Sequence, residues 1–256
     1  MAGTYKGRQF VRQREIVCGD YMDADVFPVF QPPGKRRKKC KPTKEAQKKL
    51  NQRDAERRFR RLLLLNFTEQ DVYLTLSYSR EPESREQAAR DCKNFLRRVK
   101  YALGKRGTEL KWMKCTVGGA EGTRTHHHLI LSGGLDRDEL EGLWGLGYAN
   151  SRRLRLDLDG AQGLSRYITR QKRTSYRRWS GSRNLARPEP RQTDGEISLR
   201  ELGDLAADVE RGSWGRVEAL YPGWEIIEAR ADWNTVNRGV YVRLELRRKR
   251  PGRRRE

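Results

Sequence analysis

Two strand-like stretches, residues 109–117 and 125–132, are separated by a short glycine-rich sequence, GGAEGT. Such a short connection joins neighbouring antiparallel strands, because parallel strands need a much longer crossover. A third stretch, residues 71–79, alternates apolar and polar side chains with the period of two that is typical of a strand. These stretches predict strands, and the second and third along the chain are expected to form an antiparallel pair.

Helical patterns surround these strands. SREQ at residues 84–87 is a capping box, and the apolar residues behind it fall at helical spacing as far as Gly104. Residues 43–65 are rich in basic helix formers. We also predict helices at 136–145, 161–171 and 198–210, and strands at 21–30, 148–157, 224–230 and 239–248.

The charge of the chain predicts a polyanionic partner. Its 256 residues include 56 Lys and Arg against 34 Asp and Glu, which gives a net charge of +22 and points to nucleic acid. The longest purely apolar run, Leu62–Leu65, is far shorter than a membrane span, and the N-terminus lacks the apolar core of a secretory signal. We therefore expect a cytoplasmic protein without a membrane partner. The sequence contains no GxxxxGK[ST] motif, which argues against an intrinsic ATP-driven motor.

All three histidines of the chain are consecutive, at positions 126, 127 and 128. On a strand, side chains two residues apart share a face. His126 and His128 should therefore point to one side and His127 to the other. Two neighbouring imidazoles on a rigid strand can hold a divalent metal through neutral nitrogens. The alternative is that all three are ordinary polar strand residues.

Tyr167 and Arg170 lie three residues apart in the predicted helix LSRYITRQ and would occupy neighbouring positions on its surface. A phenol beside a fixed cation and a metal suits attack on a phosphodiester, with Tyr167 as nucleophile and Arg170 stabilising the developing negative charge. The alternative is a tyrosine packed at a helix–sheet interface.

Residues 172–188, KRTSYRRWSGSRNLARP, combine arginines with aromatic residues. Stacking on aromatic rings together with phosphate contacts suits single-stranded DNA. The predicted DNA-binding residues are Arg177, Arg178, Trp179, Arg183 and Asn184. The alternative is that Trp179 belongs to the core and the arginines form a solvated face.

The order of these motifs resembles that of the HUH endonucleases, and most closely the bacterial rolling-circle replication-associated proteins. The resemblance rests on LTLSY, HHHLILSGG, ELEGLWGLGYANSRRL, GLSRYITRQ and RRWSGSRNLARP. It extends to GDYMDADVFPVF near the N-terminus and to LYPGW and NRGVYVRL near the C-terminus, so it covers most of the chain.

This resemblance implies an α+β fold with a central antiparallel sheet of about five strands, RRM-like, flanked by helices. It implies a single-tyrosine enzyme that nicks one strand at an origin, stays joined to the 5′-phosphate through Tyr167, leaves a 3′-hydroxyl as primer and later rejoins the ends. His126 and His128 would be metal ligands, with Mn²⁺ or Mg²⁺ as cofactor. The partners would be single-stranded or hairpin origin DNA and a host helicase and DNA polymerase.

The sequence departs from the family pattern at two places. Arg170 stands where the family usually has lysine, and the two cations differ in geometry. Val117 stands where the family usually ends the strand before the histidines with a carboxylate, so Glu121 in the following turn is the nearest candidate for a third metal ligand.

The predicted organisation has four parts: a basic N-terminal extension with strand and helix (1–66), the endonuclease core (67–190), a C-terminal helix and β-hairpin packing on that core (191–247), and a basic disordered tail (248–256). Two alternative functions stay open. One is a relaxase or single-strand transposase with the same chemistry, and the other is a nucleic-acid-binding protein whose catalytic site has decayed, for which Val117 is the hint.

Overall fold

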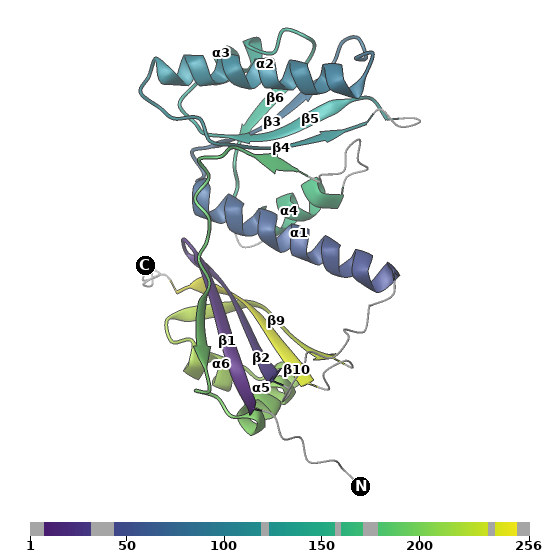
Figure 1. Cartoon of the computed structure of the whole chain (residues 1–256). Coiled ribbons are helices and arrows are strands. Elements are labelled where there is room, and N and C mark those ends of the chain that lie inside the picture. Colours follow the sequence, from purple (N-terminus) through teal and green to yellow (C-terminus); the bar gives the residue numbers. More distant parts are fainter. Residues whose placement is uncertain are drawn as a thin grey trace. The chain divides into compact units, whose positions relative to one another are not determined.

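The computed structural model describes residues 8–31, 44–118, 123–156, 160–170, 179–234 and 239–249 (Figure 1). The chain divides into two compact units. The first, called here the terminal unit, combines Met1–Thr43 with Pro188–Glu256, and the second, the central unit, is Lys44–Arg187.

The central unit contains the predicted antiparallel sheet. Its strands, in the order β6-β3-β5-β4-β7, are β3 (Val72–Ser77), β4 (Trp112–Val117), β5 (His126–Leu131), β6 (Ala149–Arg153) and β7 (Ser180–Gly181). Its helices are α1 (Lys44–Asn66), α2 (Arg85–Gly104), α3 (Arg137–Gly142) and α4 (Gly160–Arg170). The predicted α+β class and flanked central sheet are confirmed. No helix in the described residues is long and apolar enough to cross a membrane.

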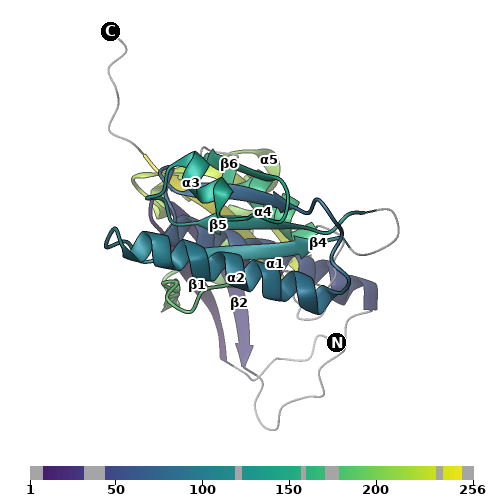
Figure 2. The same ribbon diagram turned by 90° about the horizontal axis from the view of Figure 1, so that it is seen from above.

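Helices cover both faces of this sheet, with α2 and α3 on one side and α1 and α4 on the other (Figure 1). Figure 2 looks down on the face that α2 and α3 cover. The core on that face contains Leu74, Leu129, Phe95 and Trp144, all nearly inaccessible to solvent. The opposite core contains Tyr73, Met113, Ile130, Phe59, Leu63 and Ile168. A strand that is buried on both faces, such as β5, carries apolar residues at successive positions.

The terminal unit forms a second five-stranded antiparallel sheet, which the sequence did not predict as a whole. Its strand order is β8-β1-β2-β10-β9, with β1 (Arg8–Cys18), β2 (Tyr21–Gln31), β8 (Arg191–Asp194), β9 (Trp224–Asn234) and β10 (Gly239–Arg248). The helices are α5 (Leu199–Arg211), which begins with the predicted capping box of Ser198 and Glu201, and α6 (Gly215–Leu220). Residues of α5 and α6 share a core with β2 and β10.

The compact units differ from the predicted domain boundaries. Helix α1 belongs to the central unit rather than to a separate N-terminal extension, because Phe59 and Leu63 are fully buried in the same core as Ile130 and Ile168. The first hairpin belongs with the C-terminal segment, because β2 pairs with β10 and β1 pairs with β8. The predicted tail from 248 onward lies outside the described residues apart from its first two positions.

Gly147 is a position where a side chain would break the central unit. Its φ is 153°, and a Cβ there would meet the backbone of Ser77 and Ser79 at the end of β3. We expect Gly147→Ala to lower the free energy of unfolding by about 1–3 kcal/mol. Gly163→Ala, in the interior of α4 where a Cβ meets nothing, should raise it by up to about 1 kcal/mol. Urea denaturation of both variants checks this prediction, and equal effects of the two substitutions would contradict it.

Candidate functional site

The three histidines divide between the two faces of the central sheet, as strand geometry predicts. In β5, His126 lies opposite Ser77 and Val117, and His128 lies opposite Thr75 and Cys115. Cross-strand partners share a face, and Cys115 and Val117 belong to the core under α1 and α4. His126 and His128 therefore face that side, and their rings lie edge to face with centroids 4.8 Å apart.

His127 lies on the opposite face, under α2, and is fully buried. Its Nε2 is 3.0 Å from the Tyr78 hydroxyl and its Nδ1 is 2.8 Å from Thr116 Oγ1. Burial lowers the pKa of His127 to about 3, with Lys114 and the neighbouring histidines adding to the effect. The neutral ring with both nitrogens paired is a structural element of the core.

His128 lies between two tyrosines. Its Nδ1 is 2.8 Å from the Tyr73 hydroxyl on β3, and its Nε2 is 3.3 Å from the Tyr167 hydroxyl on α4. The Tyr167 ring stands edge to face with the His128 ring at 5.1 Å. Ile168 anchors α4 in the core beneath, while Tyr167 remains 49% exposed. The structure thus joins two residues predicted from separate motifs, 39 positions apart in the chain.

The electrostatic environment keeps His128 neutral. Burial lowers its pKa to about 4, and the charges of His126 and Arg152 lower it further in the same direction. Burial also raises the pKa of Tyr73 to about 12, so its phenol stays protonated at neutral pH. A neutral imidazole has one nitrogen lone pair available for a metal or a proton.

The donor atoms fit a divalent metal in one tautomer of each ring. His126 Nδ1 lies 2.9 Å from the Arg124 carbonyl oxygen, which can only accept, so this nitrogen carries the proton and Nε2 keeps its lone pair. If His128 Nδ1 donates to the Tyr73 hydroxyl, its Nε2 is likewise a free donor. Within the described ranges, no group of three or more His, Cys, Asp or Glu residues could hold a metal, so these histidines supply two ligands at most.

The position opposite His126 on β4 contributes no ligand. Val117 is paired with His126 and is buried in the core, as expected of an apolar residue in place of the family's carboxylate. Glu121, the candidate third ligand, lies outside the described residues, as do Arg177 and Arg178.

Arg170 is held by an ion pair with α1. Its Nε donates to Glu56 Oε1 at 2.7 Å, and Gln52 donates to the same carboxylate oxygen at 2.7 Å. This pairing raises the pKa of Arg170. The contact links α4 to α1 and thereby fixes the helix that carries Tyr167. A role for Arg170 on the scissile phosphate stays a prediction.

An arginine-lined cavity of about 790 Å³ opens beside Tyr167. Tyr73, Thr75 and Tyr167 line it together with residues of β6 and the segment after it, namely Asn150, Arg152, Arg153, Leu154 and Arg155. The Arg152 guanidinium lies over the Tyr73 ring, 4.7 Å from its centroid. Sequence reasoning assigned no role to Tyr73 or Arg152, although the alternation of YANSRRLRLD places Asn150 and Arg152 on one face.

The remaining predicted DNA-binding residues lie next to β7. Trp179 is half-buried and stands edge to face with Phe59, with ring centroids 5.4 Å apart. Arg183 is exposed. Asn184 donates to the Leu110 carbonyl oxygen at 3.1 Å, which gives its side chain a structural contact. DNA binding by these residues stays a prediction.

Comparison with known families gives one result. Residues 71–172 match a family model of replication-associated proteins, the ORF2 family. The matched segment runs from β3 through α4 and contains His126, His128 and Tyr167. Searches of curated proteins and of solved structures found no match. The match supports a replication protein of the Rep type, with DNA as its partner.

Proposed function

We propose that this protein starts rolling-circle replication by nicking one strand of origin DNA through Tyr167. The observation that carries the proposal is the contact of the Tyr167 phenol with His128 Nε2 at 3.3 Å, beside His126 and at the mouth of a cavity lined by arginines. The family match over the same segment favours an initiator over a relaxase or transposase.

In the proposed reaction the Tyr167 oxygen attacks the scissile phosphorus. A bond forms between this oxygen and phosphorus, and the bond from phosphorus to the 3′-oxygen breaks. The phenol loses its proton to solvent, which reaches the half-exposed side chain, and the departing 3′-oxygen gains one. The products are a 5′-phosphotyrosine and a free 3′-hydroxyl, and the reverse reaction rejoins the strand.

His126 and His128 are the proposed ligands of a divalent cation, Mn²⁺ or Mg²⁺. Such a cation supplies Lewis-acid polarisation of the phosphate when bound. The protein's part is to hold both rings neutral and oriented, through the Arg124 carbonyl for His126 and through Tyr73 for His128. Glu121 remains a proposed third ligand.

Arg152, Arg153 and Arg155 would bind the phosphates on either side of the scissile bond, since guanidinium groups pair well with phosphate oxygens. The strand must be single at this point, as an unpaired stretch or a hairpin loop, because a phosphate of paired DNA is less free to approach a recessed phenol. With no Walker A motif in its sequence, the protein would depend on a host helicase and a host DNA polymerase.

The test uses single-stranded DNA carrying the replicon's own origin hairpin. We expect cleavage of the labelled strand with Mn²⁺ and none with EDTA, seen on a denaturing gel. A scrambled hairpin of equal length is the control. Tight binding of the origin without cleavage, in Mn²⁺ and in Mg²⁺, would instead favour a decayed site, and Val117→Glu would then be the variant to examine.

Tyr73 should act as a positioning residue for His128. Removing its hydroxyl in Tyr73→Phe takes away the 2.8 Å contact that orients the ring. We expect the metal concentration for half-maximal cleavage to rise about tenfold, as for other partners of metal-ligating histidines.

The matched control for Tyr73→Phe is Tyr78→Phe, which removes one hydroxyl from His127 on the opposite face. It should lower stability without moving the metal requirement. Equal metal titrations for Tyr73→Phe and the wild type would contradict the positioning role.

A further inference from the structure

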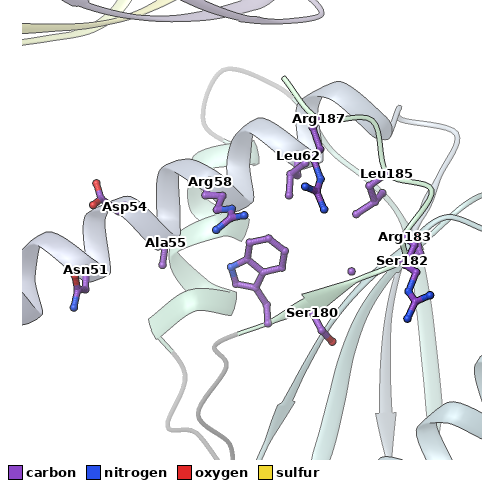
Figure 3. Close-up of a pocket in the computed structure, with 12 residues that line it drawn as sticks. Asn51, Asp54, Ala55, Arg58, Leu62, Ser180, Ser182, Arg183, Leu185 and Arg187 are labelled. Carbon is purple, nitrogen blue, oxygen red and sulfur yellow. The ribbon is translucent and has the colours of Figure 1, made fainter. Parts of the chain in front are cut away.

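A second groove of the central unit is lined by different residues from the Tyr167 cavity. It has a volume of about 800 Å³ and lies between α1 and the segment around β7 (Figure 3). Its walls are formed by Asn51, Asp54, Ala55, Arg58 and Leu62 of α1 and by Trp179–Arg183, Leu185 and Arg187. It shares no lining residue with the cavity beside Tyr167.

The charge of this groove suits an anion. Arg58, Arg183 and Arg187 contribute three guanidinium groups against the one carboxylate of Asp54. In Figure 3, Arg58 and Arg187 point toward the groove and Asp54 points away from it. None of the three arginines has an ion pair within the part of the chain that the structure describes. Their charges are therefore available to a ligand.

An anchored aromatic ring lies among these charges. Trp179 lines the groove and packs against Phe59, which is fully buried. The anchoring limits the freedom that the indole loses when a ligand binds, so a ring stacked on it costs little ordering. Arginine together with a fixed indole is the combination that binds a nucleotide through its phosphate and its base.

The segment that carries Trp179 is held in place by hydrogen bonds. The backbone N–H of Trp112 donates to Ser182 Oγ at 3.1 Å. Asn66 on α1 donates to the Ala186 carbonyl oxygen at 2.9 Å and accepts from the Ala186 N–H at 2.7 Å. Gly181 permits the close approach of Leu185, because a Cβ at this position would meet the Leu185 side chain. The groove is therefore preformed.

We propose that this groove binds single-stranded DNA, stacking one base on Trp179 and holding the adjoining phosphates with Arg58 and Arg187. The ligand is single-stranded because bases in a duplex do not expose their faces for stacking. The inference rests on the proposed function in one respect: the bound strand is the origin strand outside the nick site. The groove then adds affinity for DNA without taking part in chemistry.

The test measures binding in EDTA with a fluorescein-labelled oligothymidylate, using the full chain with Tyr167→Phe as background so that no cleavage occurs. Trp179→Leu should weaken binding about tenfold, as loss of one stacked base does. Arg58→Gln with Arg187→Gln should weaken binding and reduce the slope of log K against log salt by about 1 to 2. Because both arginines are exposed, this double variant stays informative if Trp179→Leu fails to fold.

The matched control removes two exposed arginines from α2, on the opposite face of the sheet, in Arg90→Gln with Arg97→Gln. A decrease in affinity as large as that of the groove variant would mean that only net charge matters, and it would overturn the inference. So would unchanged binding by folded Trp179→Leu together with unchanged binding by the groove double variant.

The outcome is separable from that of the proposed function. If the wild type never cleaves origin DNA but binding still depends on Trp179, the nicking proposal fails and the groove stands. If the wild type cleaves and the groove is used, Trp179→Leu should raise KM and leave kcat unchanged on long oligonucleotides.

Discussion

Tyr167→Phe should reduce formation of a covalent protein–DNA adduct by at least about a thousandfold, the scale of loss seen when a nucleophile is removed. The substitution deletes only the hydroxyl that lies 3.3 Å from His128 Nε2. The ring remains and can keep its edge-to-face contact with His128, so the fold and the affinity for single-stranded DNA should not change. Adduct is measured as labelled DNA that survives detergent and migrates with the protein.

The matched control is Tyr101→Phe, which removes an equally simple hydroxyl from an exposed tyrosine on α2. It should form adduct as fast as the wild type. If Tyr167→Phe still formed adduct at a comparable rate, another residue would be the nucleophile. The arrangement around His128 would then be a structural contact between α4 and the sheet.

The three histidines should separate into two groups when they are substituted. His126→Ala and His128→Gln should each reduce cleavage by at least about a hundredfold, the upper end of the loss caused by removing even an outer partner of a metal ligand. Raising the Mn²⁺ concentration should restore part of the activity, because each variant retains one of the two imidazoles.

His127→Leu should behave in the opposite way. It leaves the hydroxyls of Tyr78 and Thr116 without their buried partner and should lower the free energy of unfolding by about 1–3 kcal/mol. Below its melting temperature, the variant should cleave at the wild-type rate with the wild-type metal requirement. Thermal unfolding and single-turnover cleavage measure the two effects. Loss of activity in folded His127→Leu, with normal stability, would contradict this division.

Local patterns predicted most of the central unit because each element there is consistent with its own periodicity. The capping residue Ser84 and the spacing of Ala88, Cys92 and Phe95 were sufficient for α2, and all three apolar residues are buried. Alternation on β5 likewise separated His127 from the other two histidines. That Tyr167 lies near His128 was implied only by the family resemblance, since no local pattern carries a contact between residues 39 positions apart.

The elements that sequence reasoning missed lack such local signals. In β1, Val11 and Ile16 are both buried although the alternation of a strand places them on opposite faces, so the strand shows no simple pattern. Helix α6 begins at Trp214 without a side-chain cap. The contributions of Tyr73 and Arg152 depend on the register of β3 with its two neighbours, which is set by packing across the whole sheet.

Mapping the covalent linkage tests the central claim most directly. Wild-type protein is incubated with labelled origin DNA and Mn²⁺, the adduct is digested with protease and nuclease, and the modified peptide is sequenced by mass spectrometry. The account predicts a peptide containing Tyr167 with a nucleotide attached through its 5′-phosphate. A linkage to another residue, such as Tyr176, or cleaved DNA with a free 5′-phosphate and no adduct, would contradict it.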